Sequence, residues 1–568
     1  MMNTAAIDNS VKILKENKDQ WARLPIAKKI EFINQILGNL KKYAREWVDV
    51  AITNKQIDAK SPWVGEEWIA SIWALAAGLQ GYKKTLTELS NGKLPKFKKV
   101  EKTSDGRIVI QIYPNNFIES LLLNGITAEV WMQKEVTFEN LDDYIAIFYK
   151  QEDPEGKVAL VLGAGNVNSI AAYDTLYRMI AHGQVVLLKM NPVNQYLTPV
   201  YNKIFEPFIL SGYLQIISGG ADVGQYLTHH PDIDEIHITG SSRTHDAIVY
   251  GTGEEGEKNR KNNNPILQKP ITSELGGVVP LIVLPGKWNE SDIRYQAEKV
   301  VTSKLHNNGF NCISTQVLIL PEQWSQKDKF LDAIRDVLKS LPPRKFYYPG
   351  SEERLKAALE AHPQAEIFGN GGISSILITN IPSDANDECC FKEEAFCPVL
   401  AQTGLPGDTT TGYLKNAVDF CNEKLFGTLG ATILAHPKVI KELGTDLKRA
   451  ITDLRYGSIG INVWDAVAFL LPQATWGAFP GHTLNHIQSG IGVVHSTFLL
   501  EKSEKTVAYG SFYSFPRGMI HGDFIMLPKP PWFVTNKSAH KTAKRTALYA
   551  IDKNALRLPG IFASAMRG

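Results

Sequence analysis

The feature that most constrains the fold is an alternation of apolar strands and helices that begins near residue 158. Val158-Ala-Leu-Val-Leu162 contains no polar residue and runs into Gly163-Ala-Gly-Asn166, which is typical of a buried parallel strand followed by a glycine-rich turn. A helix is predicted from about residue 171 to 182, and the strand Val185-Val-Leu-Leu-Lys189 follows it. Strand, helix and strand within about 30 residues form a βαβ unit.

The same pattern continues along the chain. Strands are predicted at Leu214–Ile217 and Glu235–Thr239, with a helix near Val223–Thr228 between them. Repeated alternation of this kind predicts an α/β fold with a doubly wound, mainly parallel sheet. A second α/β block is predicted from about residue 275 to 480, so we expect two doubly wound α/β domains.

Helices are predicted in the opening part of the chain, at 27–49 and 66–86, from apolar residues at helical spacing. A β-rich stretch follows, beginning with Arg107-Ile-Val-Ile-Gln-Ile-Tyr113. The charged stretch from Glu254 to Lys269 is interpreted as a surface loop insertion. The tail carries a basic run from Lys537 to Arg545.

These patterns predict a division of the chain into three parts. Residues 1–274 are predicted to form the N-terminal helices and a dinucleotide-binding domain, with a β-extension within 107–150. Residues 275–480 are predicted to form the catalytic domain. Residues 481–568 are predicted to form a C-terminal extension, a possible oligomerisation segment.

Composition excludes several function classes. The net charge is only +2, from 61 basic and 59 acidic residues, which argues against a nucleic-acid partner. No run of about 18 apolar residues is present and the first 20 residues are polar, so neither a spanning helix nor a signal peptide is expected. The basic run in the tail is interpreted as a solvated surface, so membrane contact is not expected.

The chain has five cysteines, an odd number, and none has C-x-x-C spacing. A disulfide framework and a structural zinc site are therefore not expected, and no metal is predicted. A reducing compartment fits this cysteine usage, so a cytoplasmic location is expected.

Three segments between residues 272 and 399 carry residues suited to catalysis. They are Thr272-Ser-Glu-Leu-Gly-Gly277, Asn308-Gly-Phe-Asn-Cys312 and Glu393-Glu-Ala-Phe-Cys-Pro-Val399. In this order they resemble the glutamate, cysteine and cofactor signatures of the aldehyde dehydrogenase superfamily. Three further segments resemble family motifs in the expected order: the strand ending at Lys189, Ile238-Thr-Gly-Ser241 and Gly457-Ser-Ile-Gly-Ile-Asn462.

The resemblance implies an aldehyde dehydrogenase-like fold with a β oligomerisation extension, and a small-molecule aldehyde as substrate. Cys312 would be the nucleophile that forms a thiohemiacetal and then a thioester. The side-chain amide of Asn166, which lies 23 residues before Lys189, would hold the oxyanion. Glu274 would activate the water that hydrolyses the thioester. Family members form dimers and tetramers, so a homodimer or homotetramer is expected.

The resemblance also implies a nicotinamide cofactor. Glu394 would hydrogen-bond the nicotinamide ribose, and Phe396 would help to place the ring. Lys189 would contact the adenosine ribose, while Gly240 and Ser241, at a helix start, would face the pyrophosphate. The position that often carries a ribose-binding glutamate holds Pro192, which leaves the choice of NAD or NADP open.

The chain departs from the family at several positions. Phe310 stands where glutamine is usual in the cysteine motif, the family's stretch past Asn462 is hard to find, and the 500–568 tail has no clear family counterpart. The segment after Asn462 includes Trp464 and Phe469, which would line an apolar pocket suited to a hydrophobic aldehyde or would simply pack the core.

Two alternatives remain open at this point. The first is an acyl-CoA reductase or CoA-acylating aldehyde dehydrogenase, in which coenzyme A replaces water. Glu274 favours hydrolysis, because such relatives commonly lack this base. The second is a non-catalytic homologue with a structural or binding role. Retention of Cys312, Glu274 and Asn166 together argues against it, since a scaffold needs none of the three.

Overall fold

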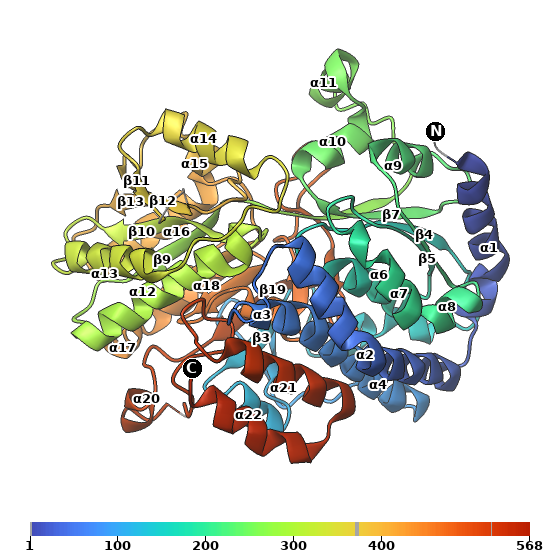
Figure 1. Ribbon diagram of the computed structural model, residues 1–568, viewed down its shortest axis with the longest axis horizontal. Helices are drawn as coiled ribbons and strands as arrows, with labels where there is room; N and C mark the ends of the chain where they lie inside the picture. The colour runs from blue at the N-terminus through green and yellow to red at the C-terminus, as the bar shows by residue number, and fades with distance from the viewer. Residues whose placement is uncertain (1–2, 370–373, 524) are drawn as a thin grey trace.

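The strands and helices predicted between residues 158 and 239 are all present in the computed structural model, which describes residues 3–369, 374–523 and 525–568 (Figure 1). All five residues of β4 (Val158–Leu162) are buried. Because successive side chains of a strand point to opposite faces, a fully buried strand has both faces of its sheet covered. Helices α1 (Thr4–Ala22) and α6 (Ile170–Ala181) both pack on this strand.

The first sheet has six strands, and its interior pairs are parallel. The antiparallel strand β17 pairs with β8 at one edge. In spatial order the strands are β17 (Gly490–Ile491), β8 (Ile271–Leu275), β7 (Glu235–Gly240), β4, β5 (Val185–Lys189) and β6 (Leu214–Ile217). The helices between these strands are α6, α7 (Thr198–Ile204), α8 (Glu206–Leu210), α9 (Ala221–Thr228), α10 (Ser242–Tyr250) and α11 (Gly253–Lys261).

The second sheet has eleven strands and carries the predicted second α/β block at its centre. Its central strands, from β19 to β12, are parallel, and both ends are antiparallel. In spatial order the strands are β1 (Val100–Lys102), β2 (Ile108–Tyr113), β3 (Thr127–Met132), β19 (Ser503–Tyr509), β15 (Ser458–Ile461), β14 (Gly430–Leu434), β9 (Val279–Val283), β10 (Thr315–Pro321), β13 (Val399–Leu405), β12 (Ser375–Ile381) and β11 (Glu366–Phe368). The predicted fold class, with two mainly parallel α/β sheets, is therefore confirmed.

Helices surround the second sheet (Figure 1). The first of them, α12, begins at a capping box in which Asn289 and Asp292 satisfy each other's backbone N–H groups. The set comprises α12 (Glu290–Leu305), α13 (Lys327–Ser340), α14 (Ser351–Ala361), α15 (Cys389–Lys392), α16 (Thr410–Lys424), α17 (Pro437–Leu443), α18 (Thr445–Asp453) and α19 (Val467–Leu470).

The chain passes from the first sheet to the second between β8 and β9, at Gly276 and Gly277. A Cβ atom on Gly276 would lie 2.1 Å from Oε1 of Glu394. Only glycine therefore allows the Glu394 side chain to approach the crossing point. Because Glu274 is the penultimate residue of β8, this crossing places it between the two sheets.

The N-terminal and C-terminal helices pack against each other (Figure 1). The N-terminal set is α1, α2 (Ile26–Asn54), α3 (Val64–Glu67), the π-helical turn η1 (Trp68–Trp73) and α4 (Ala74–Ser90). The C-terminal set is α20 (Arg517–Ile520), α21 (Ala539–Asp552) and α22 (Leu558–Ala565), of which α21 contacts α2, α3, η1 and α4. A short helix, α5 (Phe117–Leu122), lies between β2 and β3.

The structure differs from the sequence prediction in the charged stretch 254–269. Residues 254–261, the first half of this stretch, belong to helix α11 and do not form a loop. The segment does project from the surface as expected (Figure 1). Glu254 and Glu255 in the first turn, with Lys258, Arg260 and Lys261 in the last, complement the helix dipole and explain why so polar a segment is helical. Among the described residues, no helix is long and apolar enough to cross a membrane.

Candidate active site

Cys312 lies in a tight loop between α12 and β10, where its side chain is half-buried. The loop turns through three consecutive residues with positive φ: Asn307 at 51°, Asn308 at 56° and Gly309 at 77°. A Cβ on Gly309 would lie 3.0 Å from the backbone of Cys397. The loop is therefore fixed closely against the segment that follows Glu394.

Glu274 reaches this loop from the end of β8. The residue is 3% exposed, and its Oε1 atom has no hydrogen-bond partner in the described part of the chain. Burial and the nearby charge of Asp174 raise the pKa of Glu274 to about 8. The carboxyl group is thus largely protonated at neutral pH and becomes an available base just above it.

The Cys312 thiol is the third partner of this buried set. Burial raises its pKa well above the ordinary value, and the neighbouring charges of Glu274 and Glu394 raise it further. Since the thiolate is the nucleophilic form, Cys312 needs a proton acceptor at its side before it can react. The Glu274 carboxyl is a neighbour whose charge affects the pKa of Cys312, and it is the candidate for that acceptor.

Asn166 reaches the same loop from the turn after β4. Its side-chain Nδ2 donates to the backbone oxygen of Phe310 at 3.0 Å, two residues before Cys312. A carboxamide carries two N–H donors, so one remains for a ligand beside the cysteine. The three predicted catalytic residues, Asn166, Glu274 and Cys312, therefore lie close together at the cysteine loop, although they come from three distant segments.

The sequence did not indicate a buried polar network that lies against the cysteine loop. Lys55 Nζ donates to Glu67 Oε1 at 2.6 Å, to the backbone oxygen of Asn166 at 3.0 Å and to Asn307 Oδ1 at 3.2 Å. Asn168 Nδ2 donates to the other oxygen of Glu67 at 2.9 Å. The Lys55 ammonium thus connects the Asn166 turn of the first sheet with the Cys312 loop of the second.

We expect replacement of Lys55 by methionine to lower the free energy of unfolding by about 3–5 kcal/mol, because it leaves the Glu67 carboxylate buried without its cation. Lys55 and Glu67 are 3% and 4% exposed. The measurement is denaturant unfolding, with Lys12→Met as the matched control. Lys12 pairs with Glu16 on the exposed surface of α1, where a pair contributes about 0–1 kcal/mol. Equal losses in the two variants would contradict this interpretation of the network.

Glu394 has the properties of a ligand-binding carboxylate. Its Oε1 atom is buried without a hydrogen-bond partner among the described residues. Burial raises its pKa to about 8, the charge of Glu274 adds to the rise, and Lys304 and Arg354 oppose it. This buried Glu394 oxygen lies close to Gly276 and has no partner, so it is suited to accept hydrogen bonds from sugar hydroxyls. Phe396, two residues on, has a positive φ of 42°, and its ring centroid lies 6.2 Å from that of Phe310 in the cysteine loop, with the two rings tilted.

The other predicted cofactor residues lie at the carboxyl ends of the first sheet. Lys189 ends β5, where burial lowers its pKa. Gly240 ends β7, and Ser241 caps α10 by accepting a hydrogen bond from the Thr244 N–H. Ends of parallel strands next to a helix start are where α/β sheets bind nucleotides. Arg243 of α10 lies 3.8 Å from Glu393, which shows that this helix start faces the Glu394 segment.

The predicted pocket residues divide into two groups. Asn462 and Trp464 line a cavity of about 70 Å³ that is also lined by Pro530–Phe533 of the tail. Trp464 lies near the nucleophile: its Nε1 donates to the backbone oxygen of Ile313, the residue after Cys312, at 3.2 Å. Phe469 does not line this cavity and packs instead against Tyr173, Trp476 and His495.

The Asn462 side chain has a structural contact that the sequence did not indicate. Its Oδ1 accepts from the Ala435 N–H at 2.8 Å and its Nδ2 donates to the Ala435 oxygen at 2.9 Å. This paired contact joins the end of β15 to the end of β14. The amide therefore holds the strand ends together, and the Trp464 indole is the part of this segment that approaches Cys312.

Comparison with known proteins gives consistent results. Residues 126–477 match the model of the aldehyde dehydrogenase family. The chain is 24% identical over 286 residues to a 4,4'-diaponeurosporen-aldehyde dehydrogenase of Staphylococcus aureus, covering 46% of this chain and 56% of that protein. It is 26% identical over 291 residues to the peroxisomal aminoaldehyde dehydrogenase 2 of Pisum sativum, covering 47% of this chain and 50% of that protein. The chain thus spans about half the length of these two curated relatives.

A solved structure shares the fold over most of the chain. The aldehyde dehydrogenase of Mycobacterium tuberculosis complexed with NAD+ superposes with a TM-score of 0.60 at 18% sequence identity. The superposition covers 89% of this chain and 90% of that one.

Proposed function

Because the chain belongs to the aldehyde dehydrogenase family, we propose that it oxidises an aldehyde to a carboxylic acid with NAD or NADP as the hydride acceptor. Water supplies the second oxygen of the acid, and one proton is released. The observation that carries this proposal is the position of the buried Glu274 carboxyl beside the Cys312 thiol, with Asn166 bonded to the same loop.

In the proposed first step, Cys312 gives its proton to Glu274 and its sulfur bonds to the aldehyde carbon. The carbonyl oxygen becomes an oxyanion, and the second N–H of the Asn166 amide is placed to donate to it. The Phe310 carbonyl holds that amide in orientation. Because the site is buried and the donor is already positioned, little reorganisation accompanies the change in charge.

The predicted cofactor residues are of the kinds that bind a nicotinamide dinucleotide. Glu394 would accept hydrogen bonds from ribose hydroxyls, Lys189 would contact the adenosine ribose, and Gly240 and Ser241 would face the pyrophosphate at the α10 N-terminus. When bound, the nicotinamide accepts the hydride that leaves the thiohemiacetal carbon. Phe396, two residues after Glu394 and with its ring centroid 6.2 Å from that of Phe310, would limit the position of the ring.

The proposed last step is hydrolysis of the thioester on Cys312. Glu274 first releases to solvent the proton that it took from Cys312. It then takes a proton from water while the water oxygen bonds to the acyl carbon, and the Cys312 thiolate leaves. The unpartnered Oε1 of Glu274 is the acceptor for that proton. The presence of this base beside the thiol supports water as the acyl acceptor over coenzyme A.

We further propose a hydrophobic aldehyde as substrate. Trp464 bonds to the residue after Cys312, and Phe469 packs against Trp476, a neighbour of Glu274, so aromatic rings stand near the nucleophile. A homodimer or homotetramer is proposed from the family resemblance. The β-extension, β1 to β3, pairs with β19 of its own chain, so strand β1 at the end of the sheet is the part of it that faces outward.

The test of this proposal is the appearance of reduced cofactor by absorbance, with NAD or NADP and a panel of aliphatic and aromatic aldehydes. We expect turnover without coenzyme A, and higher kcat/KM for longer or aromatic aldehydes because each additional buried CH₂ adds about 0.8 kcal/mol. Turnover only with coenzyme A would establish the acyl-CoA alternative. Absence of both turnover and cofactor binding would leave a structural or binding role.

A further inference from the structure

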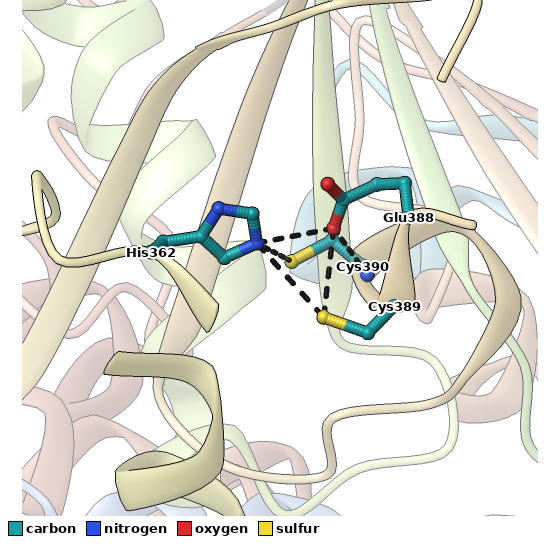
Figure 2. Close-up of side chains that lie close together, drawn as sticks. All are labelled: His362, Glu388, Cys389 and Cys390. Carbon is teal, nitrogen blue, oxygen red and sulfur yellow. Dashed lines mark hydrogen bonds and ion pairs between the residues drawn. The ribbon is translucent and has the colours of Figure 1, made fainter. Parts of the chain in front are cut away.

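A second cluster of cysteines lies outside the proposed active site. His362 follows the end of α14, and Glu388, Cys389 and Cys390 stand at the start of α15 (Figure 2). One ligand atom from each residue lies within 4.8 Å of the other three. The histidine is 26 residues from the glutamate in the chain, so the pairing is made by the fold.

The distances between the four ligand atoms are those of a metal site. His362 Nε2 lies 3.1 Å from Glu388 Oε1, 3.9 Å from Cys389 Sγ and 3.8 Å from Cys390 Sγ, and Cys389 Sγ lies 3.5 Å from Glu388 Oε1. A tetrahedral zinc ion with metal–sulfur bonds of about 2.3 Å and metal–nitrogen bonds of about 2.0 Å places its ligand atoms roughly 3.3–3.8 Å apart. The four side chains point toward one another (Figure 2), and their separations of 3.1–3.9 Å are close to that range.

We propose that His362, Glu388, Cys389 and Cys390 form a binding site for a thiophilic divalent cation, zinc above all. Two thiolates, one imidazole and one carboxylate are a ligand set that zinc accepts, and a closed set of four protein ligands is typical of a structural site. The sequence did not indicate this site, because its cysteines are adjacent instead of two residues apart.

The charges around the cluster support ionised sulfur ligands. A coordinated thiol loses its proton to the metal, so both sulfurs would bind as thiolates. The Lys304 ammonium is near enough to Cys390 to interact with its charge, and it offsets the net negative charge of the site.

Contacts link this site to the segment that carries Glu394. Gln316 Nε2 donates to the backbone oxygens of Cys390 and Glu393 at 2.8 and 2.7 Å, and its Oε1 accepts from the Ala395 N–H at 2.7 Å. A metal ion bound by Cys390 would therefore fix the start of the segment 390–395, which Gln316 of β10 holds by these hydrogen bonds. Any effect of the metal on the position of Glu394, and so on cofactor binding, rests on the proposed function. The metal site itself does not.

The experiment is a metal titration of the full-length chain in which Cys312 is replaced by alanine, so that the reactive thiol does not compete. The protein is reduced, freed of metal with a chelator, and titrated with cobalt(II) and then zinc. We expect one cobalt per chain with intense tetrahedral d–d bands and thiolate-to-cobalt charge transfer, both abolished when zinc displaces the cobalt.

Three single-cysteine variants in that background distinguish the site from other thiols. Cys389→Ala and Cys390→Ala each remove a proposed ligand, and Cys421→Ala removes a buried cysteine outside the cluster. We expect the first two to weaken zinc binding by at least about 100-fold, beyond the effect of losing an outer-shell partner, and Cys421→Ala to leave it unchanged. Because Cys389 is exposed, its replacement leaves the packing of the core intact.

The outcomes that would overturn the site are equally specific. They are an absence of cobalt charge transfer in the reduced protein, or zinc affinity that is the same in Cys389→Ala, Cys390→Ala and Cys421→Ala. Both readouts are independent of turnover, so a failure of the proposed oxidation would leave the metal result standing, and the reverse also holds.

Discussion

Replacement of Cys312 by alanine is expected to lower kcat for aldehyde oxidation by at least about 10⁴-fold, a loss of roughly 5 kcal/mol or more of transition-state stabilisation. The physical reason is that the covalent path depends on the sulfur, while Asn166 and Glu274 stay in place. Reduced-cofactor absorbance is the measurement, made at several enzyme concentrations so that residual turnover is detected. Cofactor affinity, measured by calorimetry, is expected to change little, because the proposed cofactor residues lie on other segments.

The control for this variant is Cys421→Ala, since Cys421 is buried in the second sheet's core, away from the cysteine loop. It removes a thiol of the same type and is expected to retain turnover. Turnover in Cys312→Ala at the rate of the unmodified protein would exclude the thioester path. A loss in both variants would point to a general effect of cysteine removal on folding, which unfolding curves would reveal.

The local sequence was sufficient to predict the elements that are buried on both faces. Strands β4 and β5 carry uninterrupted apolar runs, and their assignment needs no information from distant residues. The helix α11 was not predicted, because its nine residues have no apolar stripe and their helicity rests on charges at the two ends. The tail was also beyond local prediction, because β19 owes its place in the sheet to β3 and β15.

The residues of the candidate site likewise fall into those that local sequence indicates and those that only the fold brings together. Cys312, Glu274 and Glu394 stand in short motifs that can be compared with a family, so the sequence alone was sufficient to propose them. Lys55 and Glu67 could not, because a lysine and a glutamate on surface-like helices normally face solvent, and only the fold encloses them between Asn166 and Asn307. Neither could His362 be assigned to the adjacent cysteines 27 and 28 residues away.

Replacement of Glu274 by glutamine is expected to lower kcat by about 10²–10⁴-fold, the usual contribution of a positioned general base. The pH profile gives a sharper signature. Burial and Asp174 raise the pKa of Glu274 to about 8, so the carboxyl is protonated below that pH and cannot accept a proton. We therefore expect kcat of the unmodified protein to rise with pH through about 8, and to lose this rise in Glu274→Gln.

Two further variants assign that rise to Glu274. Asp174→Asn removes the buried charge that raises the pKa of Glu274, so the rise is expected to move to lower pH while its form is kept. Glu394→Gln removes the other carboxyl with a pKa of about 8. It is expected to raise KM for the cofactor and to retain the pH dependence of kcat. If the rise disappears in Glu394→Gln and persists in Glu274→Gln, the base is Glu394, and the roles proposed for the two carboxyls are reversed.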